Sequence, residues 1–282
     1  MNKITVKLED IKAQTQKALV NHGASKSTAE SVAEAVKVAE AENNKVCGLY
    51  YLESYCNQLK SNRVDGSVSP EVKKPSTSSV YVDAKNGFAQ PAFAAGFELA
   101  ISTARENGIC LFTIAHSHTC TSMGFFTSQI AKKGLLGIGA TVAPACVSPP
   151  GGNKPLLGTN PISMSVPSDN NDVAFQFDQS TSAIAIGKIR MAASNGESIP
   201  EGWAVDKDGK PTTDPNKALE GSILSSGGYK GFGFGLMAEI LASALTGSLS
   251  SVNAPPLKTT EGEPHNLGQT YILSDPNFNG EK

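Results

Sequence analysis

The amino-acid sequence predicts an α/β fold beneath an N-terminal cap of helices. From residue 8 to residue 59, apolar residues recur at helical spacing, which is typical of packed amphipathic helices. Between residues 80 and 177, short apolar strands alternate with helical segments, as in a sheet covered by helices. We therefore divide the chain into a helical cap, 1–75, and an α/β domain, 76–282.

The cap is predicted to hold three helices. Residues 8–21 and 25–42 repeat apolar side chains every three to four positions, and a short third helix covers 49–59. The stretch 62–79 is polar and contains Gly and Pro, so it predicts a loop that leads into the second domain.

The α/β domain is predicted from apolar runs that end at turn residues. Asn86-Gly87 and Gly134 are such turns, and the polar stretch 196–221 predicts an exposed loop. The predicted strands are 80–83, 109–114, 135–142, 162–166, 173–177 and 271–273. The predicted helices are 91–106, 121–133, 180–193 and 231–245.

The bulk composition predicts a soluble, cytoplasmic protein. A net charge of −2 offers no basic surplus for nucleic acid or an anionic membrane. No apolar run approaches the ~20 residues that span a bilayer, and the first residues lack the apolar core of a secretory signal. The five cysteines form no Cys-x-x-Cys pair, so they predict free thiols in a reducing compartment.

The common signatures of nucleotide binding and hydrolysis are absent. Gly137-Ile-Gly139 lacks the third glycine of a dinucleotide fingerprint, and Gly231 to Gly235 lie inside an apolar helix. No Walker A loop and no G-x-S-x-G elbow occur. His116 and His118 lie on one side of an extended chain, but two histidines are an incomplete ligand set. We therefore predict a polar pocket lining there and no metal site.

Three polar segments carry residues suited to a nucleotide, each with a purely structural alternative. The loop Pro149–Pro161 begins with two prolines and two glycines, which let backbone amides approach a ligand or simply turn the chain. Asp178–Ser182 offers a carboxylate and three hydroxyls for ribose or phosphate, or for a helix cap. Gly227–Lys230 precedes an apolar helix, where amides and a lysine could hold a pyrophosphate or stay solvated.

A collinear series of segments links these loops to a known enzyme family. The segments are Val82–Gly87, Gly134–Ile138, Pro149–Pro161, Phe177–Ser182, Gly187-Lys188, Gly196–Trp203, Asp206–Gly209, Pro211–Pro215 and Gly227–Gly231. They span nearly the whole chain and resemble the malate/L-lactate dehydrogenase family, which includes sulfolactate dehydrogenase and the cyclic-imine reductases. The resemblance implies a non-Rossmann nucleotide-binding fold with a mixed sheet, NAD or NADP as cofactor, and a homodimer. The missing glycine fingerprint agrees with it.

The resemblance also implies which residues contact the ligands. The cofactor contacts that it implies are Asp178, Ser180, Thr181, Ser182, Tyr229 and Lys230. Thr159 and Asn160 are expected to shape the substrate pocket, together with His116.

The sequence departs from the family at the positions that carry the chemistry. The family motif Asp-Ser-His-Gly-x-x-Arg aligns with Lys45–Tyr51, so Cys47 replaces the histidine and Tyr51 replaces the arginine. Tyr51 can donate a hydrogen bond to the substrate but cannot pair with its carboxylate. Cys47 is either a reactive group or a small buried side chain. We expect His118, which the cyclic-imine reductases also carry, to be the proton donor or a substrate contact.

These observations predict an oxidoreductase that exchanges hydride with C2 of a small 2-oxo or 2-hydroxy acid, such as malate or lactate. A cyclic-imine reductase is the first alternative, and a catalytically silent homologue that serves as a binding subunit is the second. Family chains continue past the position of Asp275-Pro276 to an Arg-x-Pro-Gly motif that helps hold the cofactor, and we expect this chain to lack that segment.

Overall fold

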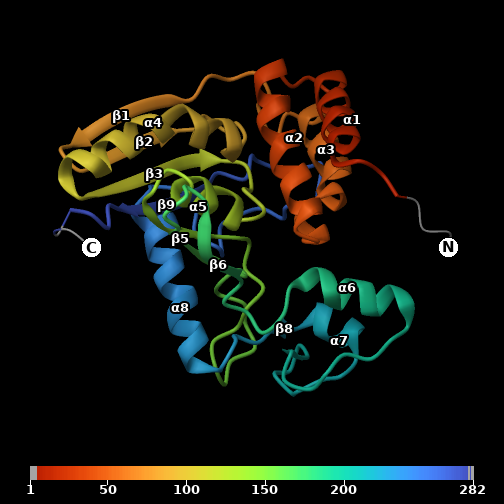
Figure 1. The fold of residues 1–282 in the computed structure, drawn as a ribbon. Coiled ribbons are helices and arrows are strands. Elements are labelled where there is room, and N and C mark those ends of the chain that lie inside the picture. The colour runs from red at the N-terminus through yellow and green to blue at the C-terminus, as the bar shows by residue number, and fades with distance from the viewer. Residues whose placement is uncertain (1–4, 279, 281–282) are drawn as a thin grey trace.

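The computed structural model describes residues 5–278 and 280, and it begins with a bundle of three cap helices (Figure 1). These are α1 (Leu8–Asn21), α2 (Lys26–Ala41) and α3 (Leu52–Lys60), with the short 3₁₀ turns η1 (Lys45–Cys47) and η2 (Leu49–Tyr51) between α2 and α3. Their apolar faces meet around Leu19, Val36 and Tyr55, all buried. This burial explains the helical spacing seen in the sequence.

A seven-stranded sheet forms the centre of the second domain, in the order β1-β2-β3-β9-β4-β5-β6. The strands are β1 (Glu71–Ser76), β2 (Ser79–Asp83), β3 (Ile109–Ser117), β4 (Leu136–Thr141), β5 (Ile162–Pro167), β6 (Val173–Gln179) and β9 (Leu267–Ser274). Strands β2 and β3 run parallel to each other, and all the remaining neighbouring pairs run antiparallel. The predicted mixed sheet is therefore confirmed.

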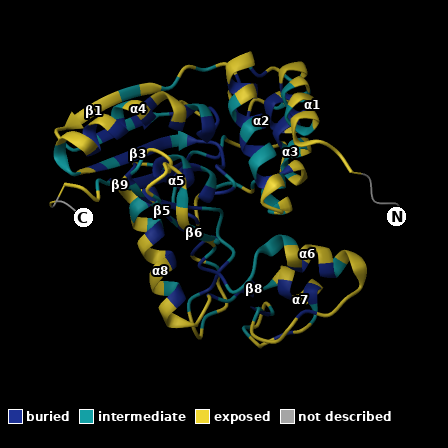
Figure 2. Ribbon diagram, in the orientation of Figure 1, coloured by how far each residue is buried: buried dark blue, intermediate teal, exposed yellow. Residues whose placement is uncertain are grey.

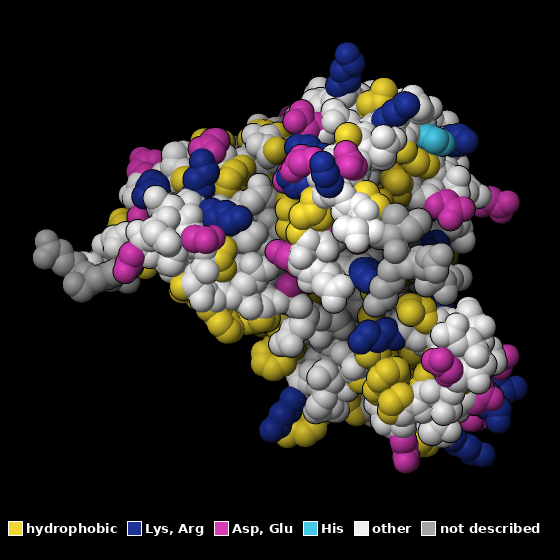
Figure 3. Space-filling view, turned by 45° about the vertical axis from the view of Figure 1, so that its right-hand side comes forward, with side chains coloured by type: hydrophobic (Ala, Val, Ile, Leu, Met, Phe, Trp, Pro, Cys, Tyr) yellow, Lys and Arg dark blue, Asp and Glu magenta, His cyan; other side chains and the backbone are white. Residues whose placement is uncertain are grey.

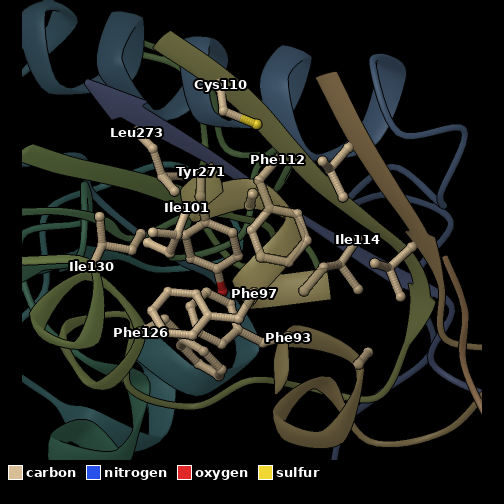
Figure 4. Packing of buried hydrophobic residues seen from close by; sticks show 14 of the residues in the cluster. Phe93, Phe97, Ile101, Cys110, Phe112, Ile114, Phe126, Ile130, Tyr271 and Leu273 are labelled. Carbon is tan, nitrogen blue, oxygen red and sulfur yellow. The ribbon is translucent and has the colours of Figure 1, made fainter. Parts of the chain in front are cut away.

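The largest core lies between the sheet and two helices, α4 (Ala89–Asn107) and α5 (Gly124–Ala131). Phe93 stands at its centre, with the rings of Phe112, Phe126 and Tyr271 within 5.0 to 5.3 Å of its own (Figure 4). Figure 2 shows that the buried residues gather in this layer and between the cap helices. The opposite face of β9 contacts the π-helix η3 (Ile240–Ala244), because alternate side chains of a strand point to opposite faces.

The elements β1, β9 and α6 (Ile186–Asn195) differ from the prediction. The polar stretch predicted as a loop contains β1, an exposed strand at the edge of the sheet. Its sequence is rich in lysine and lacks the apolar alternation by which a strand is recognised. Strand β9 is longer than the predicted 271–273 and lies in the middle of the sheet. Helix α6 begins later than predicted, because residues 180–185 pair with the chain around Ser225. The predicted boundary between the domains, after residue 75, falls inside β1, which belongs to the sheet. The division into 1–75 and 76–282 stays a prediction.

A small lobe, at the lower right of Figure 1, replaces the exposed loop predicted for 196–221. It holds α6, α7 (Pro215–Glu220) and the two-stranded sheet of β7 (Ala204–Val205) and β8 (Ser222–Ile223). Its own apolar core includes Val147, Ile189 and Ala218. The lobe therefore places α6 as a rigid element beside the cap.

Helix α8 (Tyr229–Glu239) runs from the lobe back to the sheet and continues into η3. Its inner side is buried and its outer side is exposed (Figure 2). The exposed residues include large apolar ones, Phe234, Leu236 and Met237. Within the described residues, no helix is long and apolar enough to cross a membrane.

Candidate functional site

The three segments predicted to bind a nucleotide lie side by side. The Thr181 amide donates to the Thr159 carbonyl at 2.9 Å, and the Ser226 amide donates to the Thr181 carbonyl at 2.9 Å. Ser182 forms a further bridge with Ser225. The loop Pro149–Pro161, the segment after β6 and the turn before α8 thus form one surface.

A pocket of about 540 Å³ opens on this surface at the start of α8. Apart from Trp203 and Leu224, the residues that line it are small or proline: Ser148, Pro150, Gly151, Ala183, Gly202, Ser225, Ser226, Gly227 and Gly228. Gly228 precedes the helix with φ of 66°, a conformation that glycine adopts without strain. Tyr229 and Lys230 follow it and are exposed. The first amides of α8 therefore face a space suited to an anionic group.

Asn160 ties the loop to the inner side of α8. It is fully buried, and its Nδ2 donates to the Gly235 carbonyl at 3.2 Å and to Glu239 Oε2 at 2.7 Å. Its Oδ1 accepts from the Ala143 amide at 3.2 Å. These bonds fix the direction of α8 relative to the pocket, while the predicted substrate contact of Thr159 and Asn160 remains untested.

A second group of predicted residues, Cys47, Tyr51 and Asp178, lies where the cap approaches the edge of the sheet. Asp178 Oδ2 accepts hydrogen bonds from Ser122 Oγ at 3.0 Å and the Gly124 amide at 2.8 Å. Burial nevertheless raises the pKa of the Asp178 carboxyl above its ordinary value. Asp178 therefore serves the first turn of α5 and retains a proton to a higher pH than an exposed aspartate.

Cys47 and Tyr51 are both held in their protonated forms. Burial raises the pKa of the Cys47 thiol to about 12, and the nearby Asp178 carboxylate adds to this increase. Burial likewise raises the pKa of the Tyr51 hydroxyl, whereas Arg190 of α6 acts in the opposite direction. Cys47, Tyr51, Asp178 and Arg190 come from three segments that are distant in sequence, and they form a chain of electrostatic interactions. They lie where α6 of the lobe approaches the η1 turn of the cap, a region that we call the cleft.

The backbone beside this cleft is strained. Thr121 has φ of 63°, which is rare for a β-branched residue, and its Oγ1 donates to the Cys120 carbonyl at 2.6 Å. His116, the last residue but one of β3, has φ of 53°. Such conformations gather at functional sites, where the surrounding structure enforces them. Nothing in the residue pattern around Thr121 and His116 predicts these backbone conformations.

His118 is enclosed rather than open to the cleft. Its Nε2 donates to Gln58 Oε1 at 3.0 Å, and its ring stacks on His265 with centroids 4.2 Å apart. Burial lowers the pKa of His118 well below 6.5 and that of His265 to about 3, and the Arg63 charge adds to both shifts. Both rings are therefore neutral near pH 7, which favours a supporting role for His118 behind Tyr55, 5.6 Å away. Its predicted role as proton donor remains untested.

The neutral histidine pair predicts acid lability. The pKa values of both histidines are depressed in the folded state, so below pH 6.5 the unfolded chain binds more protons than the folded chain. The free energy of unfolding should therefore decrease as the pH is lowered from 6.5 towards 3. The slope is about 1.4 kcal/mol per pH unit for each histidine. Urea unfolding at a series of pH values measures it, and His265→Phe should reduce the slope. Equal unfolding free energies at pH 7 and pH 4.5 would contradict the assignment.

His116 lies at the ends of β2 and β3. Its Nδ1 contacts Asp83 Oδ1 at 2.9 Å, and its amide donates to Ser248 Oγ at 3.2 Å. Its predicted contact with the substrate remains a prediction. Among the described residues, no three His, Cys, Asp or Glu side chains gather in a group that could hold a metal ion.

A mixed sheet without a glycine fingerprint, an amide-lined pocket at a helix start and a neighbouring cleft with a buried acid define a non-Rossmann, nucleotide-dependent enzyme. The family model described as malate/L-lactate dehydrogenase matches residues 6–282. The chain belongs to this family. The assignment confirms the predicted class, a dehydrogenase or reductase that acts on CH–OH or C=N and uses NAD or NADP.

Relatives with named activities include both types of substrate. The chain is 38% identical over 245 residues to the Δ1-pyrroline-2-carboxylate/Δ1-piperideine-2-carboxylate reductase of Pseudomonas putida, with 86% of this chain and 72% of the relative covered. It is 36% identical to the NADP-dependent (2R)-3-sulfolactate dehydrogenase of Chromohalobacter salexigens, with 96% and 81% covered. The crystal structure of the Δ1-piperideine-2-carboxylate reductase of Pseudomonas syringae superposes with a TM-score of 0.93 at 34% identity, covering 99% of this chain and 84% of the other.

Proposed function

We propose that this chain reduces the C=N bond of a small cyclic 2-imino acid with NADH or NADPH. The observation that carries the proposal is the buried Asp178 carboxyl, which Ser122 Oγ and the Gly124 amide hold in one orientation near Cys47, and whose pKa burial raises. A cyclic imine is itself basic, and its protonated form accepts hydride without a strong base. The cleft suits this chemistry, and the names of several relatives agree with it.

Oxidation or reduction at C2 of a hydroxy or oxo acid is the second candidate. The sulfolactate dehydrogenase relative supports it. Removing a hydroxyl proton needs a general base, a role that the Asp178 carboxylate and not the Cys47 thiol could fill. More of the relatives with named activities act on cyclic imines than on hydroxy acids. We therefore rank malate and lactate below the imino acids as substrates.

The pocket at α8 fits a nicotinamide dinucleotide. Its amides and the positive end of the helix suit a pyrophosphate, with Tyr229 and Lys230 at the rim. The hydroxyls of Ser180 and Ser182 border the same surface and suit a ribose. The bound cofactor supplies the hydride. Thr181 is buried and holds Thr159 in place, so its contribution to cofactor binding is indirect.

On the substrate side, Asp178 is the group we assign to proton exchange. The amide of Gly124 and the hydroxyl of Ser122 hold its carboxyl in one orientation, and burial favours the protonated form. Tyr51 donates a hydrogen bond to the substrate, and Cys47 fills the wall beside Asp178. This changes the role of Asp178 from the cofactor contact expected by resemblance to a catalytic acid.

The test is a panel assay of the purified chain that follows the absorbance of reduced nicotinamide. We expect Δ1-pyrroline-2-carboxylate and Δ1-piperideine-2-carboxylate to be reduced faster than pyruvate, oxaloacetate or sulfopyruvate. Faster turnover of the oxo acids would favour the second candidate. Cofactor binding without any turnover would favour the silent homologue, and absence of cofactor binding would refute the enzyme.

We also propose that two copies associate through the outer side of α8. This helix is largely apolar, and together with η3 and the residue that follows η3, it exposes large apolar side chains by 41–54%: Phe234, Leu236, Met237, Ile240 and Leu245. Its acidic residue, Glu239, bonds inward to Asn160, and its one lysine, Lys230, lies in the first turn, so the exposed apolar stretch from Phe234 onward can pair with itself about a twofold axis. Light scattering should give a dimer that Ile240→Glu dissociates; a monomeric wild type would overturn this.

The five free cysteines support a cytoplasmic location.

A further inference from the structure

Helix α6 forms the wall of the cleft that faces the cap. A Cβ atom at Gly187 would lie 3.7 Å from Val46 Cγ1, next to Cys47, so the start of α6 contacts the η1 turn. Ile189 is fully buried in the lobe core together with Cys146, which fixes the rotation of the helix. Arg190 follows Ile189 and is exposed. On the face shown in Figure 3, Lys and Arg side chains lie where the lobe approaches the cap.

The Arg190 guanidinium is available to a ligand. In the part of the chain that the structure describes, it forms no ion pair. Its charge acts to lower the pKa of both the Tyr51 hydroxyl and the Cys146 thiol, although burial dominates in each. Arg190 lies three positions after Gly187, so it is on the side of α6 that approaches the η1 turn, which is followed by η2, the turn that ends at Tyr51. This placement agrees with the effect of its charge on the two side chains.

A substrate that carries a carboxylate needs a cation in this cleft. The buried histidines do not supply one, because both rings are neutral. The Lys258 ammonium lies over the ring of Tyr50, 3.3 Å from its centroid, and 5.0 Å from the ring centroid of Tyr51, so it is held against the ring faces. A guanidinium binds a carboxylate through two parallel hydrogen bonds, and a neighbouring hydroxyl can donate a third. Arg190 and Tyr51 provide this combination from opposite sides.

We propose that Arg190 binds the carboxylate of the substrate, with the Tyr51 hydroxyl as a second donor, and so selects 2-carboxylated imines or oxo acids. This inference rests on the proposed function, since it names the group that recognises its substrate class. The carboxylate becomes anchored between the lobe and the cap. Its C2 atom is then held on the side of the cleft where Asp178 lies.

The kinetic test compares Arg190→Met with a matched control on the same helix. We expect Arg190→Met to raise KM for Δ1-piperideine-2-carboxylate by about a hundredfold with a much smaller change in kcat. Arg190→Lys should recover part of the loss, because lysine keeps the charge but not the paired geometry. Lys188→Met removes a charge two positions away, on a different side of the helix, and should keep the wild-type KM. NADPH affinity should be equal in all variants.

A binding test separates this proposal from the proposed function. The probe is pyridine-2-carboxylate, a planar ring acid without a bond that the enzyme would reduce, titrated calorimetrically into the wild type and each variant. Wild-type binding that Arg190→Met weakens about a hundredfold supports the anchor even if the panel assay shows no turnover. Failure of the wild type to bind the probe, or an Arg190→Met variant with unchanged KM and probe affinity, would overturn it.

Discussion

Replacing Asp178 with asparagine is expected to lower kcat for imine reduction by roughly 10²- to 10⁴-fold, the usual contribution of a positioned acid or base. The amide keeps the size of the carboxyl and still accepts from Ser122 Oγ and the Gly124 amide, so the first turn of α5 stays in place. Cofactor affinity, measured by NADPH fluorescence, should change little. The matched control is Asp172→Asn, an exposed acid on the turn between β5 and β6.

The pH profile sharpens this expectation. Burial raises the pKa of Asp178, so its protonated form persists to a higher pH than in an exposed aspartate. If the protonated carboxyl supports reduction, kcat falls as pH rises through that pKa, and Asp178→Asn removes this dependence. A wild-type kcat in the Asp178→Asn variant would contradict the role of Asp178 as a catalytic acid. Asp178 would then be a cofactor contact or a cap for the first turn of α5.

Gly231→Ala is expected to have the largest effect on cofactor binding. A Cβ atom there would lie 1.8 Å from the Ser226 carbonyl oxygen, so the turn before α8 must move. Overpacking of this kind costs about 1–3 kcal/mol of stability. Since the displaced turn lines the pocket, we expect NADPH affinity to fall at least tenfold, which corresponds to about 1.4 kcal/mol.

Gly233→Ala on the same helix provides the control. A Cβ atom at Gly233 meets nothing within 4 Å, so the substitution changes only helix propensity. Alanine is favoured over glycine in a helix by about 1 kcal/mol, so this variant should be as stable as the wild type or more stable. Urea unfolding with and without NADPH measures both effects. Equal NADPH affinities for the two variants would show that the turn does not take part in binding.

Local periodicity was enough to predict much of the fold. Helices α1, α2 and α4 and strands β2 to β6 lie close to their predicted ranges, because each buries one regular face that the residue pattern records. Strand β1 was missed, since an edge strand can be polar on both faces. Helix α6 was placed too early, since residues 180–185 find their partners in a distant turn.

The candidate site divides in the same way. The loop Pro149–Pro161, Asp178–Ser182 and Gly227–Lys230 were predicted together, because an ordered series of motifs identifies a family without knowledge of contacts. Arg190 was not predicted, although it lies just after the Gly187-Lys188 segment, because nothing in the residues around it points to Tyr51. Only the packing of α6 against the η1 turn brings the two together.

By itself, the sequence determined the α/β class, the family and the segments that meet around the cofactor pocket, because these depend on residue types and their order. The tertiary structure decided the state of each ionisable group. Burial keeps His118 neutral and keeps Asp178 protonated to a higher pH than usual. The packing of α6 beside the η1 turn brings Arg190 towards Tyr51. Desolvation and the distances between charges arise from the whole fold, so residue order does not reveal them.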